Sequence, residues 1–167
     1  MKKAVFCLAL FTILATGTVF ADHPGGFGIG VQGGFSGTWG VVGNYGGGAL
    51  SLKLPSLPVF WAIRLDILTD FFNLWVSGDY YLIDSKLVPA IGLNWYLGIG
   101  GALGLSFGSN WMGLGLAARL PIGLSWQPVR LLEIFLQVVP SLGVSIVPEF
   151  HFPYGGWGGD IGIRLWF

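Results

Sequence analysis

The sequence has a single cysteine, Cys7, and few charged side chains for its length. Because Cys7 lies inside an apolar N-terminal run, the chain beyond that run has no disulfide and no thiolate metal site. Charged residues make up 10% of the sequence, against about 25% in an average soluble protein. No basic run or patch is present, which argues against a nucleic-acid partner. These absences argue against a disulfide-stabilised scaffold and against a nucleic-acid-binding protein.

Residues 1–21 have the pattern of a cleaved signal peptide. Lys2 and Lys3 precede the apolar run 4–17, and the small residue Ala21 ends a sequence that favours cleavage after it. A retained membrane anchor is the alternative, but the run is shorter than the ~20 residues of a spanning helix. We therefore expect one exported domain, residues 22–167.

Apolar residues are abundant: 53% of the sequence is hydrophobic, 16% is aromatic, and the mean hydropathy is +0.72. The stretch 87–108 contains no charge and would pass as a transmembrane helix on a hydropathy window. Its large apolar side chains, however, fall at every second position: Ile91, Leu93, Trp95, Leu97 and Ile99. A period of two belongs to a strand rather than a helix.

The same alternation recurs along the chain and predicts eight strands. They are residues 27–36, 50–54, 61–67, 74–82, 90–107, 114–126, 132–138 and 160–167. A bilayer cannot satisfy the polar groups of an open sheet edge, so such a sheet must close on itself. The predicted fold is all-β, an eight-stranded antiparallel transmembrane β-barrel with an up-and-down meander.

An even strand count places both termini at one end of the barrel, which we take as periplasmic. The periplasmic turns are then expected at 55–58, 84–86 and 127–131. The outer loops are expected at 37–44, 69–72, 108–111 and 140–158. The last of these is the longest and is the candidate ligand loop, with Glu149, His151, Tyr154 and Trp157.

Eight charged residues share the small, polar parity of the predicted strands: Lys53, Arg64, Asp66, Asp79, Arg119, Glu133, Asp160 and Arg164. A soluble barrel would put the apolar parity inside, but an eight-stranded interior is too small for that many Trp, Leu and Phe side chains. Aromatic residues also gather on the apolar parity near the strand ends, as in a bilayer-spanning barrel: Trp61, Tyr80, Phe107, Trp111, Trp126 and Phe167. The apolar parity is therefore expected to face lipid.

The interior charges are four positive and four negative, so they can neutralise one another. Removing one partner of a buried ion pair costs ~3–5 kcal/mol, so these charges must be paired. The three arginines can each make bidentate hydrogen bonds to the four acids. We interpret this lumen charge cluster as a structural plug. The alternatives are a gated path for ions or solutes and a proton relay, but equal numbers of both signs argue against a selectivity ring.

No catalytic constellation stands out in the sequence. His23 lies near the predicted mature N-terminus, and neither it nor His151 has a Ser or Cys at a motif spacing. Glu149 and His151 are too few ligands to predict a metal site. We predict no enzyme and no cofactor. A narrow channel or transporter for small apolar solutes and a lipid-modifying enzyme are the alternative functions.

Three stretches resemble a small family of spirochaetal OmpA-like outer-membrane barrels of unknown function: "ARLPIGLSW" (118–126), "EIFLQVVPSLG" (133–143) and "DIGIRLWF" (160–167). That family tends toward a second acidic residue where this chain has Gln137. The resemblance implies a porin-like, surface-exposed barrel in the outer membrane, with a host extracellular protein as a partner. It supplies no catalytic residue.

The chain ends on an apolar row, Ile163, Leu165 and Phe167, which resembles the signal that barrel-assembly machinery recognises. The expected partners are therefore outer-membrane lipid, the assembly machinery and a host extracellular protein. The protein is expected to be a monomer.

Overall fold

The computed structural model describes residues 23–38, 45–67 and 71–167, so the predicted signal peptide lies outside the described residues. The strands are β1 (Gly28–Thr38), β2 (Tyr45–Lys53), β3 (Val59–Ile67), β4 (Phe71–Val88), β5 (Leu93–Gly108), β6 (Met112–Arg119), β7 (Ile122–Val129), β8 (Leu132–Val147) and β9 (His151–Trp166). A 3-10 helix, η1 (Pro89–Ile91), lies between β4 and β5. Within the described ranges, no helix is long and apolar enough to cross a membrane.

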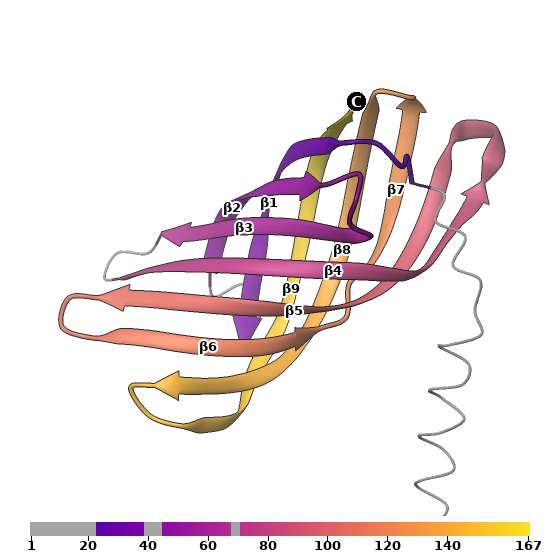
Figure 1. Cartoon of the computed structure of the whole chain (residues 1–167). Coiled ribbons are helices and arrows are strands. Elements are labelled where there is room, and N and C mark those ends of the chain that lie inside the picture. Colours follow the sequence, from indigo (N-terminus) through magenta and orange to yellow (C-terminus); the bar gives the residue numbers. More distant parts are fainter. Residues whose placement is uncertain (1–22, 39–44, 68–70) are drawn as a thin grey trace, which may run out of the picture.

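The strands form one closed antiparallel sheet that wraps around a common axis (Figure 1). β1 pairs with β9 from Gly28 opposite Trp166 to Thr38 opposite Gly156, which closes the ring. β6 and β7 occupy one strand position, because both pair with β5 on one side and β8 on the other. They are separated at Pro121, which has no N–H to donate to the ladder. The predicted eight-stranded antiparallel barrel is therefore confirmed.

The register of the ring sets its width. From Trp166, cross-strand partners lead through Gly28, Lys53, Phe60, Asp79, Gly100, Arg119 and Ser141 to Gly156, which precedes Trp166 by ten residues in β9. With ordinary strand spacings, this stagger over eight strand positions gives a tilt of about 41° and a Cα radius of about 8 Å. A barrel this narrow is filled by side chains.

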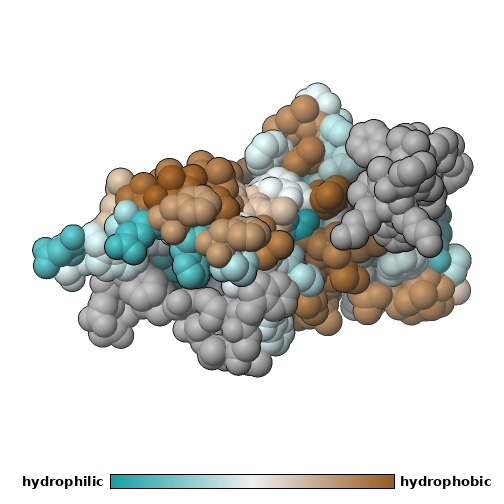
Figure 2. Space-filling view, turned by 90° about the horizontal axis from the view of Figure 1, so that it is seen from below, coloured by the Kyte–Doolittle hydropathy of each residue, from teal (hydrophilic) through white to brown (hydrophobic). Residues whose placement is uncertain are grey.

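The two faces of the sheet differ sharply in polarity. Along β9, Ile161 is 60% exposed and Ile163 48%, whereas the flanking residues Asp160 and Arg164 are 6% and 2% exposed. On β1, Val31 is 64% exposed. Hydrophobic residues cover broad areas of the surface seen in Figure 2. The apolar parity therefore faces outward and the charged parity lines the lumen, an arrangement suited to a lipid surrounding.

The expected outer loop at 140–158 is wrong. β8 continues to Val147 and β9 begins at His151, so only residues 148–150 connect them. Two features hid these strands in the sequence. Pro140 lies within β8, opposite Trp157, and the glycines of 155–159 offer no apolar side chain to the pattern. Glycine does not prevent pairing here, because this part of β9 pairs with both β8 and β1.

The expected turn at 84–86 is also wrong. Asp84, Ser85 and Lys86 lie within β4, opposite Tyr96, Trp95 and Asn94, and the chain reverses over residues 89–92 instead. The reversal ends at Gly92, whose φ of 70° favours glycine. The prediction relied on the turn-forming residue types at 84–86. Asp84, however, is buried in the lumen, where it has a partner, and does not lie in a turn. Of the other three expected outer loops, 108–111 coincides with the connection between β5 and β6. Most of 37–44 and the first half of 69–72 lie outside the described residues, and Phe71 and Phe72 belong to β4.

Candidate functional site

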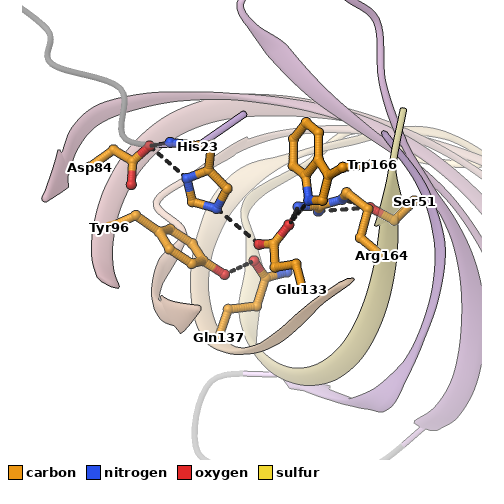
Figure 3. A network of polar contacts seen from close by, with 8 residues as sticks. All are labelled: His23, Ser51, Asp84, Tyr96, Glu133, Gln137, Arg164 and Trp166. Atoms are coloured by element: carbon orange, nitrogen blue, oxygen red, sulfur yellow. Dashed lines mark hydrogen bonds and ion pairs between the residues drawn. The ribbon is translucent and has the colours of Figure 1, made fainter. Parts of the chain in front are cut away.

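His23 enters the lumen at its inner end, defined as the end where β1 begins and β9 finishes (Figure 3). Its Nδ1 lies 2.6 Å from Oδ2 of Asp84, and its Nε2 lies 2.9 Å from Oε1 of Glu133. The backbone N–H of His23 donates to the same oxygen of Asp84. In the sequence, His23 is distinguished only by its place near the predicted mature N-terminus. Nothing in the local sequence pairs it with acids 61 and 110 positions away.

The two carboxylates decide the protonation of His23. Burial opposes a positive charge on the imidazole, but the hydrogen bonds to Asp84 and Glu133 outweigh it and raise the pKa of His23 from 6.5 to about 9. At neutral pH the ring is therefore an imidazolium that donates from both nitrogens. It ties β4 to β8 through a residue that belongs to neither strand.

Glu133 is the centre of this inner network, which consists of His23, Ser51, Asp84, Glu133, Arg164 and Trp166. Arg164 donates from Nη1 to Oε2 of Glu133 at 2.7 Å, and Trp166 donates from Nε1 to the same oxygen at 2.8 Å. The remaining guanidinium nitrogens of Arg164 donate to Oγ of Ser51. Both charged partners are almost fully buried, so each needs the other.

Aromatic rings fill the space around the inner network. Phe60, Tyr81 and Tyr96 form a stack with centroid spacings of 4.1 and 4.3 Å. The imidazole of His23 meets all three rings edge-on. The guanidinium of Arg164 lies 4.8 Å from the ring centre of Phe60, a cation–π distance. The inner end of the lumen is thus packed with side chains.

The outer half of the lumen holds the other arginines. Arg119 donates to both carboxylate oxygens of Asp79, at 3.0 and 3.1 Å. Arg64 donates from Nε to Asp66 at 2.8 Å and from Nη1 to Asp160. Arg64 also reaches the carbonyl of Gly34 at 3.1 Å.

Two further residues complete the placement of the predicted charge cluster. Gln137 donates to Asp160 and accepts from the Tyr96 hydroxyl, which links the two halves of the lumen. Lys53 differs from the expectation of neutralised charges, because its Nζ donates to the carbonyls of Leu54 and Leu57 in the turn after β2. The structure thus joins seven of the eight predicted residues in acid–arginine contacts and leaves Lys53 bonded to backbone.

The residues of the candidate ligand loop do not form one surface. Glu149 lies in the short connection, whereas His151, Tyr154 and Trp157 belong to β9. The ring of Trp157 packs edge-on against Phe35 at 5.5 Å. Tyr154 and Trp157 both line the cavity in the outer half of the lumen. Among the described residues, no group of three or more His, Cys, Asp or Glu could hold a metal ion.

A cavity of about 130 Å³ occupies the outer half of the lumen. Its polar lining includes Arg64, Asp66, Asn73, Arg119 and Asp160, and its aromatic lining includes Trp75 and Tyr154. The sequence predicts a lumen filled by side chains throughout. The small side chains Ala62, Ala102 and Ala117 line the same space and leave it unfilled.

Comparison with known proteins identifies the fold. No family model matches this sequence, and no curated protein matches it. Among solved structures, the chain is similar to the N-terminal β-barrel domain of Pseudomonas aeruginosa OprF, with 15% identity and a TM-score of 0.53, and to Neisserial surface protein A (NspA), with 12% identity and a TM-score of 0.54. Each comparison covers 86% of this chain and 98% of the other. The chain therefore has the fold of the eight-stranded, OmpA-like outer-membrane β-barrels.

Proposed function

We propose that the protein is an outer-membrane barrel with a structural or surface-interacting role and a lumen closed at its inner end. The observation that carries the proposal is the inner network, in which His23, Asp84, Glu133 and Arg164 fill a narrow lumen with paired charges. Breaking such a pair leaves a buried charge, so each partner holds the others in place. The proposal includes no enzymatic step.

The outer-membrane location is supported by the apolar exterior and by the fold. Exposed apolar side chains on the described strands present a continuous surface that suits lipid. The terminal row of Ile163, Leu165 and Phe167 lies on this exterior, where assembly machinery can read it. Surface interaction, including contact with a host extracellular protein, is proposed for the tip of the β8–β9 hairpin, where Phe150 is 74% exposed and Phe152 60%.

Planar-bilayer recording tests the closed lumen. Refolded wild-type protein is expected to give no discrete openings. Replacing Glu133 by Ala removes the shared partner of His23 and Arg164, and we expect brief openings in that variant. His151→Ala is the matched control, since His151 lies outside the inner network. Steady openings of the wild-type protein would contradict the proposal and favour the channel alternative.

Site-directed labelling tests location and orientation. Phe150→Cys places a thiol at the β8–β9 tip, and Leu57→Cys places one in the turn after β2, at the opposite end; Leu57 is 41% exposed. A membrane-impermeant maleimide added to intact cells should label the first variant and spare the second. The reverse pattern would invert the orientation, and labelling of neither in intact cells, with both labelled after lysis, would remove the surface role.

A further inference from the structure

The outer cavity, named here the outer chamber, has an unbalanced set of charges. Asp66 and Asp160 line the chamber, and Asp79 lies next to it, paired with the lining residue Arg119. Only two guanidiniums meet these three carboxylates among the described residues. Arg119 is engaged by both oxygens of Asp79, so Arg64 is shared between the other two acids. The undescribed stretches 39–44 and 68–70 contain no lysine or arginine.

The other cations of the lumen serve its inner end. His23 and Arg164 bond to Asp84 and Glu133, and Lys53 donates to turn carbonyls. Within the described part of the chain, one of the three carboxylates in the outer half of the lumen therefore has no cation of its own. In a narrow lumen with little water, such a charge attracts a positive group strongly.

Asn73 independently indicates that the chamber binds a hydrogen-bond donor. It lines the chamber, is 7% exposed, and its Oδ1 has no hydrogen-bond partner. It lies directly across from Asp66 in the register of β3 and β4. A buried acceptor without a donor is costly, so this wall favours a guest that donates hydrogen bonds. The adjacent carboxylate favours a guest that is also positively charged.

The aromatic side of the chamber suits an apolar or cationic group. A Cβ at Gly104 would lie 2.5 Å from two ring atoms of Trp75, so this glycine lets the indole lie against the wall. The rings of Trp75 and Tyr154 both come within 3.6 Å of the Cβ position of Gly115, where they converge. An aromatic face attracts a cation placed over it.

We propose that the outer chamber binds a small organic monocation, of which a short primary alkylammonium is the simplest form. Its N–H groups donate to Oδ1 of Asn73 and to the carboxylate of Asp66, and its alkyl group lies against Trp75. The chamber, at about 130 Å³, is close to the ~150 Å³ cavity that admits benzene in another protein. A divalent metal ion fits less well, because metals of this kind need more oxygen ligands than the described side chains bring together.

Titration with n-butylammonium, using n-butanol as the neutral match, tests the proposal on the refolded full barrel. The probe is the indole ¹⁵N–H signal of Trp75, assigned through Trp75→Phe. Butylammonium should shift this signal saturably, and butanol should bind at least about tenfold more weakly, as expected for losing a charged hydrogen bond. Equal affinities would overturn the proposal. So would the absence of a saturable shift, which would indicate that a proton neutralises the extra carboxylate.

Two variants locate the site on Asp66 and Asn73. Asp66→Asn keeps an acceptor for Arg64 but removes the charge, and Asn73→Leu removes the unpaired acceptor. Each should weaken butylammonium binding about tenfold or more. Asn94→Leu is the matched control, because Asn94 also has a buried Oδ1 without a partner but does not line the chamber. An equal loss of butylammonium affinity in the Asn94 variant would overturn the assignment. If a variant fails to fold, the comparison of butylammonium with butanol on the wild-type protein still tests the proposal.

Discussion

At the scale of the residue, His23 shows how a side chain outside every strand can organise a barrel. Its imidazole contributes two hydrogen bonds and a positive charge to a lumen that otherwise places Asp84 and Glu133 against a single guanidinium at the inner end. Its neighbours are aromatic rings, so the acids are its polar contacts within the inner network. The charge state of one imidazole should therefore be visible in the stability of the whole domain.

We expect the free energy of unfolding to fall at alkaline pH because of His23. Its pKa is raised from 6.5 to about 9 in the folded protein, so its contribution is complete below 6.5 and is lost as the pH rises through 9. The loss should be on the order of 3 kcal/mol. Urea unfolding in lipid vesicles, followed between about pH 6 and pH 10, measures it. His23→Gln should flatten this part of the profile, and an unchanged profile in that variant would refute the assignment.

At the scale of the element, each carboxylate of the outer half lies opposite a glycine on the neighbouring strand. The pairs are Asp160 with Gly34, Asp66 with Gly47, and Asp79 with Gly100. A Cβ on any of these glycines would come within 2.6 Å of the carboxylate oxygen. The missing side chain lets the acid lie along the wall and turn toward its arginine. Glycine in these strands therefore leaves space for the carboxylate side chains, in addition to letting the strands bend.

Gly100→Ala should displace Asp79 from Arg119 and destabilise the barrel by about 1–3 kcal/mol, the usual cost of overpacking. The new Cβ would lie 2.0 Å from Oδ1 of Asp79 and 2.4 Å from the carbonyl of Gly78. Gly101→Ala is the matched control, since the nearest atom to its Cβ, the carbonyl oxygen of Ala117, is 3.8 Å away. Urea unfolding of both variants measures the two changes in the free energy of unfolding. Equal decreases would show that lost strand flexibility, rather than displacement of the Asp79 carboxylate, causes the destabilisation.

The β8–β9 hairpin should behave as paired strands rather than as a loop. We expect slow amide hydrogen exchange for Val144 and for Trp157, and fast exchange for Glu149 and Phe150 in the connection. Exchange followed by NMR on the refolded barrel resolves these amides. Uniformly fast exchange across 140–158 would restore the loop that the sequence suggested.

At the scale of the whole molecule, the barrel has the reverse of a soluble protein's arrangement. Its charged side chains lie in the lumen and its apolar side chains lie on the outer surface. Replacing Val31, 64% exposed on the apolar exterior of β1, by Arg should destabilise the protein in lipid vesicles by ~2–4 kcal/mol if that position lies near mid-bilayer. Phe150→Arg, at the 74% exposed hairpin tip, is the control and should cost ~0–1 kcal/mol. Equal costs would contradict the placement of the apolar belt.

Much of the barrel was predictable because its cause is local. Alternation at period two, seen in Ile161, Ile163 and Leu165 against Asp160 and Arg164, assigns the residues of a recognised strand to lipid or lumen without knowledge of the neighbouring strands. The need to close an edge in a bilayer then dictates the barrel. The local signal failed where residue type and position disagreed, at Asp84 within β4 and at Pro140 within β8.

The sequence by itself determined most of the strand pattern, the apolar exterior and the eight charges of the predicted lumen cluster. Only the tertiary structure decided which charges meet, that His23 enters the lumen, and that a cavity is left in the outer half. The reason is the stagger of ten residues around the ring, which brings together side chains from distant strands, such as Arg64 and Asp160. A periodic pattern within one strand carries no information about that stagger.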